Sequence, residues 1–114
     1  MALSNADTVR ASFNAYVAQD REAADRLLAE DLVFTSPQDD HIDKTAYFER
    51  CFPTTNRLKS QEILKVVDAG DGAFILYEYE LKTGGRYRNT EYITVRDGQI
   101  VEIQVFFGGL VRQT

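Results

Sequence analysis

The sequence has few residues of the kinds that form disulfides or bind metals. Its 114 residues include one cysteine, Cys51, one histidine, His41, and no tryptophan. A single cysteine cannot form an intrachain disulfide, and one cysteine with one histidine is too few for a structural zinc site. Cys51 lies on an apolar helical stripe, where we expect a buried and unreactive thiol.

Positive charge is neither abundant nor clustered. The chain has 13 Lys and Arg against 18 Asp and Glu, so its formal net charge is -5. Binding to nucleic acid through counterion release needs several cations on one face. We therefore expect no nucleic-acid partner.

Long apolar runs and nucleotide-binding motifs are also absent. No run approaches the roughly 20 residues that cross a bilayer, and the N-terminal segment MALSNADTVR has no apolar signal-peptide core. The sequence contains no glycine-rich phosphate loop, nucleophile elbow or dinucleotide fingerprint. We expect a cytoplasmic protein that uses no metal or cofactor and does not contact a membrane.

The remaining composition is typical of one globular domain. Hydrophobic residues make up 44% of the chain and charged residues 27%, and no repeat, low-complexity tract or linker interrupts it. A chain of this length can bury most of its apolar surface in one core. The 7 Phe and 6 Tyr residues can fill that core or line a cavity. We expect a single domain over residues 1–114.

The N-terminal half has the pattern of three helices. Apolar residues recur at helical spacing after each of three capping residues, Ser4, Asp20 and Asp43. The predicted helices run over about 5–18, from Asp20 to about residue 31, and from Asp43 to just before Pro53. Residues 32–35 are predicted to form a short strand that Pro37 ends.

From about residue 61 the apolar pattern alternates with a period of two. Strands are predicted over about 61–68, 73–82, 86–96 and 99–107, and glycine-containing turns separate the last three from their predecessors. Helices followed by an antiparallel meander indicate an α+β fold, with the helices packed on one face of the sheet.

Two segments carry a resemblance to a known family. The stretch DREAADRLLAEDLVFTSP and the ending YITVRDGQIVEIQVFF resemble the SnoaL-like group of the nuclear transport factor 2-like superfamily, over roughly Asp7 to Gly108. The resemblance implies a cone-shaped fold in which a strongly curved sheet wraps the first helix, with an apolar pocket at the open end and often a homodimer. This fold hosts isomerases, cyclases, dehydratases, ligand binders and protein adaptors, so the function stays open.

Strand alternation near the C-terminus predicts which side chains face the pocket. A three-residue RDG loop with Gly98 at a left-handed position pairs Val95 with Gln99 and Glu91 with Ile103. The pocket face then carries Asn89, Glu91, Ile93, Ile103, Val105 and Phe107, and the outer face carries Thr90, Tyr92, Thr94, Glu102, Gln104 and Phe106. The mixed outer face is typical of a wet dimer surface. If DG alone forms the turn, Glu91 instead shares the solvated face with Glu102 and Gln104.

A second carboxylate, Glu78, is predicted to lie beside Glu91. A loop centred on Gly84 and Gly85 places the two opposite each other, where they share a proton unless Arg86 or Arg88 binds one of them. The alternative is a solvated or arginine-paired acid.

The resemblance also implies a chemistry. Ketosteroid isomerases in the superfamily use an acid before a proline as base, with a helix-one tyrosine and a late-strand acid that stabilise the enolate. Tyr16 and Glu91 match the last two, but Ser36 stands at the base position. The loop beyond it offers Asp39, Asp40, His41 and Asp43 as substitutes, and Asp40 could orient His41 as a general base. Alternatively the loop is only a polar rim, and the hydroxyl of Tyr16 bonds a backbone carbonyl.

Two hypotheses follow. In the first, the protein is a homodimer that binds a small hydrophobic, carbonyl-bearing or ring-containing molecule and transfers protons as an isomerase, cyclase or dehydratase. The expected catalytic residues are Tyr16, Asp40, His41 and Glu91, and the expected ligand-binding residues are Phe13, Ser36, Phe52, Glu78, Asn89, Ile103, Val105 and Phe107. In the second, the fold is a non-catalytic binding or association module. An open cavity that holds Tyr16, His41 and Glu91 favours the first, and a filled cone or a solvent-directed His41 favours the second.

Overall fold

The computed structural model describes residues 3–111, and its N-terminal half contains the three predicted helices. They are α1 (Asn5–Ala18), α2 (Arg21–Leu27) and α3 (Lys44–Arg50), followed by a 3₁₀ helix, η1 (Phe52–Arg57). The side chains of Ser4, Asp20 and Asp43 each accept a hydrogen bond from a backbone N–H of the first helical turn, which confirms the three predicted caps. The outer ends of the predicted domain, residues 1–2 and 112–114, lie outside the described residues.

Six strands form one sheet in the order β2-β1-β6-β5-β4-β3. Their bounds are β1 Leu28–Ser36, β2 Asp39–Ile42, β3 Leu58–Ala69, β4 Gly72–Leu81, β5 Arg86–Arg96 and β6 Gln99–Leu110. All neighbours are antiparallel except β1 and β6, which are parallel. The first strand begins four residues earlier than predicted, and β2 was not predicted because DDHI lacks an apolar alternation.

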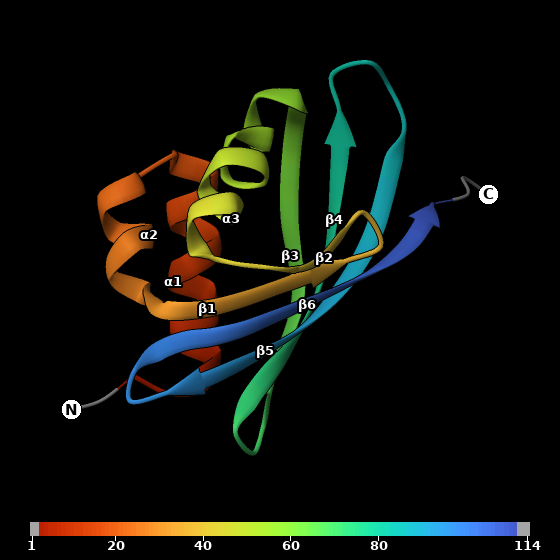
Figure 1. Cartoon of the computed structure of the whole chain (residues 1–114). Coiled ribbons are helices and arrows are strands. Elements are labelled where there is room, and N and C mark those ends of the chain that lie inside the picture. Colours follow the sequence, from red (N-terminus) through yellow and green to blue (C-terminus); the bar gives the residue numbers. More distant parts are fainter. Residues whose placement is uncertain (1–2, 112–114) are drawn as a thin grey trace.

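The helices lie on one side of a strongly bent sheet. Figure 1 shows β3 and β4 running steeply across the direction of β1 and β6, with α1, α2 and α3 gathered on the inner side of the bend. Buried side chains of α1, α3 and the inner sheet face form one hydrophobic cluster. The predicted α+β fold, with helices packed on a curved and mainly antiparallel sheet, is confirmed. Within residues 3–111 no helix is both long and apolar enough to cross a membrane.

The register of β5 and β6 differs from the prediction, although the predicted faces are correct. Asp97 and Gly98 both have positive φ, at 53° and 78°, so DG alone forms the two-residue turn. By itself this turn would direct Glu91 to solvent. Between Thr94 and Val95 the register shifts by one residue, because β6 contains the extra residue Val101.

The shift returns the side chains to the predicted faces. Glu91 pairs with Val105 in place of the predicted Ile103, and it lies on the buried inner face of the sheet. Moving a strand by two residues preserves the side that each residue faces, whereas moving it by one reverses that side. The predicted register was therefore wrong by two residues, while the predicted placement of Glu91 was correct.

Candidate functional site

An open cavity of about 670 Å³ lies between α1, the α3–η1 segment and the inner face of the sheet. Its volume lies in the range of small-molecule sites. Eight of the predicted site residues line it, namely Phe13, Tyr16, Ser36, Asn89, Glu91, Ile103, Val105 and Phe107. Four others, Asp40, His41, Phe52 and Glu78, do not.

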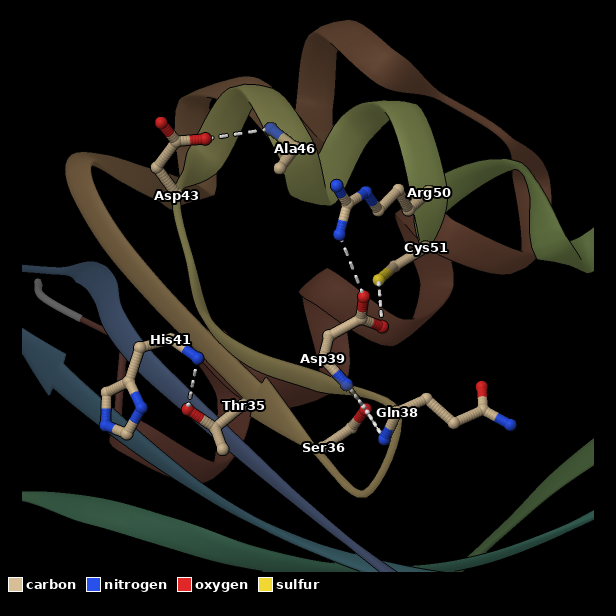
Figure 2. A network of polar contacts seen from close by, with 9 residues as sticks. All are labelled: Thr35, Ser36, Gln38, Asp39, His41, Asp43, Ala46, Arg50 and Cys51. Atoms are coloured by element: carbon tan, nitrogen blue, oxygen red, sulfur yellow. Dashed lines mark hydrogen bonds and ion pairs between the residues drawn. The ribbon is translucent and has the colours of Figure 1, made fainter.

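Asp40 and His41 form the predicted pair, but outside the cavity. His41 Nδ1 lies 2.5 Å from Asp40 Oδ1, and the two side chains are 68% and 91% exposed. The His41 backbone N–H bonds Thr35 Oγ1, and Figure 2 shows the ring directed away from Asp39 and Cys51. The expected placement of the pair at the cavity is thus corrected. His41 has a positive φ of 50°, and the register between β1 and β2 shifts between Phe34 and Ser36, so β2 does not alternate regularly and both side chains of the pair face solvent.

Glu78 lies on the outer face of the sheet, opposite Arg88 and not opposite Glu91. Its carboxylate accepts hydrogen bonds from Arg86 Nε at 2.6 Å and Arg88 Nε at 2.7 Å. These bonds hold the pKa of Glu78 below its usual value, and the two guanidinium groups cover the carboxylate. The arginine-paired alternative is therefore correct for Glu78, and the proton-sharing carboxylate pair was wrong.

Phe52 belongs to the core. It is 4% exposed, and its ring contacts those of Phe48 and Tyr16. Phe52 lies on the predicted apolar stripe of the helix. At this position, however, the stripe packs against other core side chains and not against the cavity.

Glu91 is the buried carboxyl group of the cavity. Its Oε2 accepts a hydrogen bond of 2.6 Å from the Tyr77 hydroxyl, which in turn accepts one of 3.3 Å from Asn89 Nδ2. Burial raises the pKa of Glu91 to about 7, and the Tyr77 bond partly opposes this rise. At neutral pH a large fraction of Glu91 is therefore protonated. No residue among 3–111 hydrogen-bonds the other oxygen, Oε1. Because Oε2 accepts from Tyr77, a proton on Glu91 sits on Oε1, where it can be donated in a hydrogen bond to a ligand.

The phenols around Glu91 stay protonated. Burial first, and then the charge of Glu91, raise the pKa values of Tyr47 and Tyr77 well above the usual value. Both residues line the cavity, where they present neutral, polarisable rings. Neither phenol therefore ionises in the pH range where Glu91 titrates.

A second carboxylate, Asp39, enters the cavity from the turn between β1 and β2. Ser36 Oγ accepts hydrogen bonds from the backbone N–H groups of Gln38 and Asp39, at 3.1 and 3.2 Å. This turn directs the Asp39 side chain, 17% exposed, toward α3, where Arg50 Nη1 lies 3.3 Å from Oδ1 (Figure 2). The serine that replaces the expected acid thus positions another acid three residues later.

The charges of both carboxylates, Asp39 and Glu91, act on the Cys51 thiol. Its Sγ lies 3.9 Å from Asp39 Oδ2. Burial, and then the charge of Asp39, raise the pKa of the thiol to about 12, while Arg50 opposes this and Glu91 adds a smaller effect. Asp39 and Glu91 are therefore both near enough to act on one group, and the half-buried thiol is not a thiolate at neutral pH.

The Tyr16 hydroxyl is committed to a neighbouring side chain. Thr54 Oγ1 donates its only proton to the Cys51 carbonyl at 2.7 Å, so Tyr16 donates to Thr54 Oγ1 across 2.6 Å. Tyr16 therefore presents lone pairs to the cavity, in place of the O–H donor that was expected for a developing oxyanion.

The sequence contained signals for the residues that were missed. Tyr77 lies two residues after Ile75 on β4, so both side chains point to the inner face. A serine whose hydroxyl can close a turn two or three residues ahead also indicates Asp39 over Asp40. Among residues 3–111, no group of three or more His, Cys, Asp and Glu side chains is arranged to hold a metal ion.

Solved structures share this architecture. A protein from Kribbella flavida is 25% identical over 89% of this chain and 84% of its own, with a TM-score of 0.79. A "putative polyketide cyclase" from Sinorhizobium meliloti is 22% identical, with coverage of 88% and 94% and a TM-score of 0.77. An NTF2-like protein of unknown function from Mesorhizobium loti is 23% identical, with coverage of 92% and 91% and a TM-score of 0.78.

The sequence matches the model of one protein-domain family. No curated protein matches the chain. The profile of the SnoaL-like domain matches residues 9–103, which include most of α1, the other helices, the Asp39 turn and Glu91. The chain therefore belongs to the SnoaL-like domain family, with the NTF2-like fold.

Proposed function

We propose that the cavity binds a small, hydrophobic, ring-containing molecule that carries a carbonyl or enol oxygen. The single observation that carries this proposal is a buried carboxyl group, Glu91, in an open cavity whose other walls are largely aromatic and aliphatic. A buried acid with a raised pKa can donate a hydrogen bond to a ligand oxygen at neutral pH. The name of the Sinorhizobium meliloti relative is compatible with a ring-containing ligand.

The chemistry that fits the two carboxyl groups is proton transfer next to a carbonyl. The Asp39 carboxylate removes a proton from the carbon beside the carbonyl, and the electrons of the broken C–H bond form an enolate. Glu91 Oε1–H donates a hydrogen bond to the enolate oxygen and stabilises its charge. Asp39 then returns the proton to the same carbon or to a conjugated one, so the reaction needs no cofactor.

Neighbouring side chains support both roles. Arg50 stabilises the charge of Asp39, and within residues 3–111 the other carboxylate oxygen, Oδ2, contacts only the weak thiol donor of Cys51. Tyr77 fixes Glu91 through Oε2 and leaves Oε1 available. In this arrangement Asp39 takes the base role that the sequence suggested for His41, and Glu91 takes the role of oxyanion donor.

Hydrogen-deuterium exchange of a simple ketone tests the proposal. In D₂O at pH 6, we expect the protein to accelerate exchange at the α-carbon of 2-tetralone, measured by proton NMR. Asp39→Asn and Glu91→Gln should each lower this acceleration by about a hundredfold, which is typical of general acid-base groups. Asp40→Asn is the matched control, because this neighbouring acid is 91% exposed and does not line the cavity. Exchange at the buffer rate with the wild type, or equal loss in all three variants, contradicts the proposal.

A non-catalytic binding module is the second candidate. The solvent-directed His41 and the absence of an acid at Ser36 favour it, whereas the open cavity disfavours a filled cone. This candidate predicts that 2-naphthol binds in the cavity while 2-tetralone shows no accelerated exchange. Fluorescence titration of the naphthol and the exchange experiment together separate the two functions.

We also propose that the protein forms a homodimer through the outer face of the sheet. Phe74 and Phe106 on this face are 48% and 50% exposed, and Phe74 packs against Tyr92. Burying these rings against a second copy would remove apolar surface from water. Light scattering should give twice the monomer mass for the wild type and the monomer mass for Phe106→Lys. A monomeric wild type at about 100 μM, above usual dimer dissociation constants, contradicts this.

A further inference from the structure

Arg57 is a cation on the wall of the cavity with no acidic partner among residues 3–111. It ends η1, lines the cavity and is exposed, so it lies where the cavity meets solvent. Other arginines form ion pairs with acidic side chains. Arg50 pairs with Asp39, and Arg96 pairs with Asp31.

Gln61, on β3, adds an unsatisfied amide to the same side of the cavity. Its Oε1 is buried and has no hydrogen-bond partner within the described residues. A buried polar atom without a partner costs about 1–3 kcal/mol, so this amide is poorly satisfied in the ligand-free protein. Gln61 lines the cavity four residues after Arg57. Its Oε1 only accepts hydrogen bonds, so a ligand anion can use this position after a 180° rotation of the terminal amide, which places an Nε2–H donor there.

The charges on the cavity wall define what these two side chains can bind. Asp39 and Arg50 cancel each other, and a protonated Glu91 is neutral. Of the described residues that line the cavity, Arg57 then carries the one uncompensated charge. A single positive charge on the same cavity wall as an amide that can donate N–H groups matches a monoanion, and the planar guanidinium matches a carboxylate in particular.

We propose that the ligand carries one carboxylate group, which Arg57 and the Gln61 amide bind at the mouth of the cavity while the ring system extends toward Glu91. This inference rests on the proposed function and names its ligand class, a ring-containing carbonyl or enol compound with a carboxylate substituent. A phosphate dianion fits less well, because its second charge would have no cation on this wall. Arg57 and Gln61 are ligand-positioning residues and take no part in the proton transfer.

Binding of two matched probes tests the inference. At pH 6 and low ionic strength, we expect 2-naphthoate to bind the wild type at least about fivefold more tightly than neutral 2-naphthamide, as a charge-assisted contact at a partly exposed site should give. Arg57→Gln should remove this preference and leave naphthamide affinity within about twofold. Gln61→Met, which keeps the side-chain length, should weaken naphthoate binding selectively. Calorimetric titration measures all of these affinities.

Arg10→Gln is the matched control, since it removes the same charge from an exposed position on α1 outside the cavity. It should leave both affinities unchanged. Equal affinity of the two probes for the wild type, or equal loss of both in Arg57→Gln, overturns the carboxylate site while ring binding stands. If neither probe binds the wild type, the proposed ligand-binding function fails as well.

Discussion

Tyr77 donates a 2.6 Å hydrogen bond to Glu91 from the neighbouring strand, and both side chains are buried on the inner face of the sheet. Asn89 donates to the same hydroxyl, so the side chains of Asn89, Tyr77 and Glu91 form one hydrogen-bonded network across β4 and β5. Glu91 is thereby held with one oxygen bonded and the other facing the cavity. The protonation of this group links the stability of the fold to the proposed chemistry.

Glu91→Gln should change how stability depends on pH. The folded-state pKa of Glu91, about 7, is above its ordinary value of 4.5, so the folded protein binds a proton that the unfolded chain releases. The stability that this proton provides is fully present below pH 4.5 and is lost as pH rises through 7, by on the order of 3 kcal/mol. We expect Glu91→Gln to remove this decline and to exceed the wild type in stability at pH 8.

Urea unfolding between pH 4 and 8 measures this effect. Glu49→Gln is the control, because Glu49 is an exposed acid on α3, and it should keep the wild-type decline. An unchanged decline in Glu91→Gln would show that another group causes it.

Tyr77→Phe should raise the pKa of Glu91 above 7. The Tyr77 hydrogen bond favours the ionised carboxylate, so its removal leaves burial unopposed. We also expect a loss of about 1–2 kcal/mol in stability, because Glu91 and Asn89 each lose a partner. Carbon-13 NMR titration of the glutamate carboxyl groups measures the pKa. Tyr87→Phe, which removes a phenol stacked on Tyr79, should leave it unchanged.

Ser36→Ala should release the turn that carries Asp39. The Ser36 hydroxyl accepts two backbone N–H groups there, so its loss should cost about 1 kcal/mol and speed amide exchange at Gln38 and Asp39. The acceleration of 2-tetralone exchange should fall in parallel, because a mobile Asp39 spends less time in reach of the ligand. Ser60→Ala, at an exposed position on β3, is the control. Wild-type exchange rates in Ser36→Ala would contradict a positioning role.

Lys44→Met should destabilise the connection between α2 and β1. The buried Lys44 ammonium lies 3.0 Å from the Leu28 carbonyl and 3.0 Å from Asp25 Oδ1. Methionine keeps the apolar stem but leaves the carbonyl without its donor, which should cost about 1–3 kcal/mol in unfolding experiments. Lys59→Met removes an exposed lysine that pairs with Glu80, and it should change stability by less than about 0.5 kcal/mol. Equal effects of the two substitutions would contradict this account.

Much of the fold could be predicted because its signals are local. The capping side chains at Ser4, Asp20 and Asp43 bond to N–H groups within their own first turns, so each helix start depends on a few adjacent residues. The alternation along β5 likewise depends on strand geometry alone.

The candidate site was predicted only in part. Tyr16, Ser36 and Glu91 line the cavity as expected, whereas Asp39 replaces His41 beside it. The difference arises in the SPQD turn and in β2, where the positive φ of His41 interrupts the strand alternation, so that Asp39 faces inward and His41 faces solvent. Which of them faced inward depended on the pairing of β2 with β1, and the polar segment has no apolar residue that reports this pairing.

Local sequence patterns were sufficient to predict the helix starts, the strand-rich second half and the presence of one acid among apolar neighbours on β5. Three further features depend on how the whole chain packs: the bulge at Val101, the pairing of Glu78 with two arginines and the entry of Asp39 into the cavity. The physical reason is that side chains of a strand alternate with a period of two. One inserted residue or one different turn therefore reverses which face a group occupies, and it is the packing of the whole sheet against the helices that selects between the two.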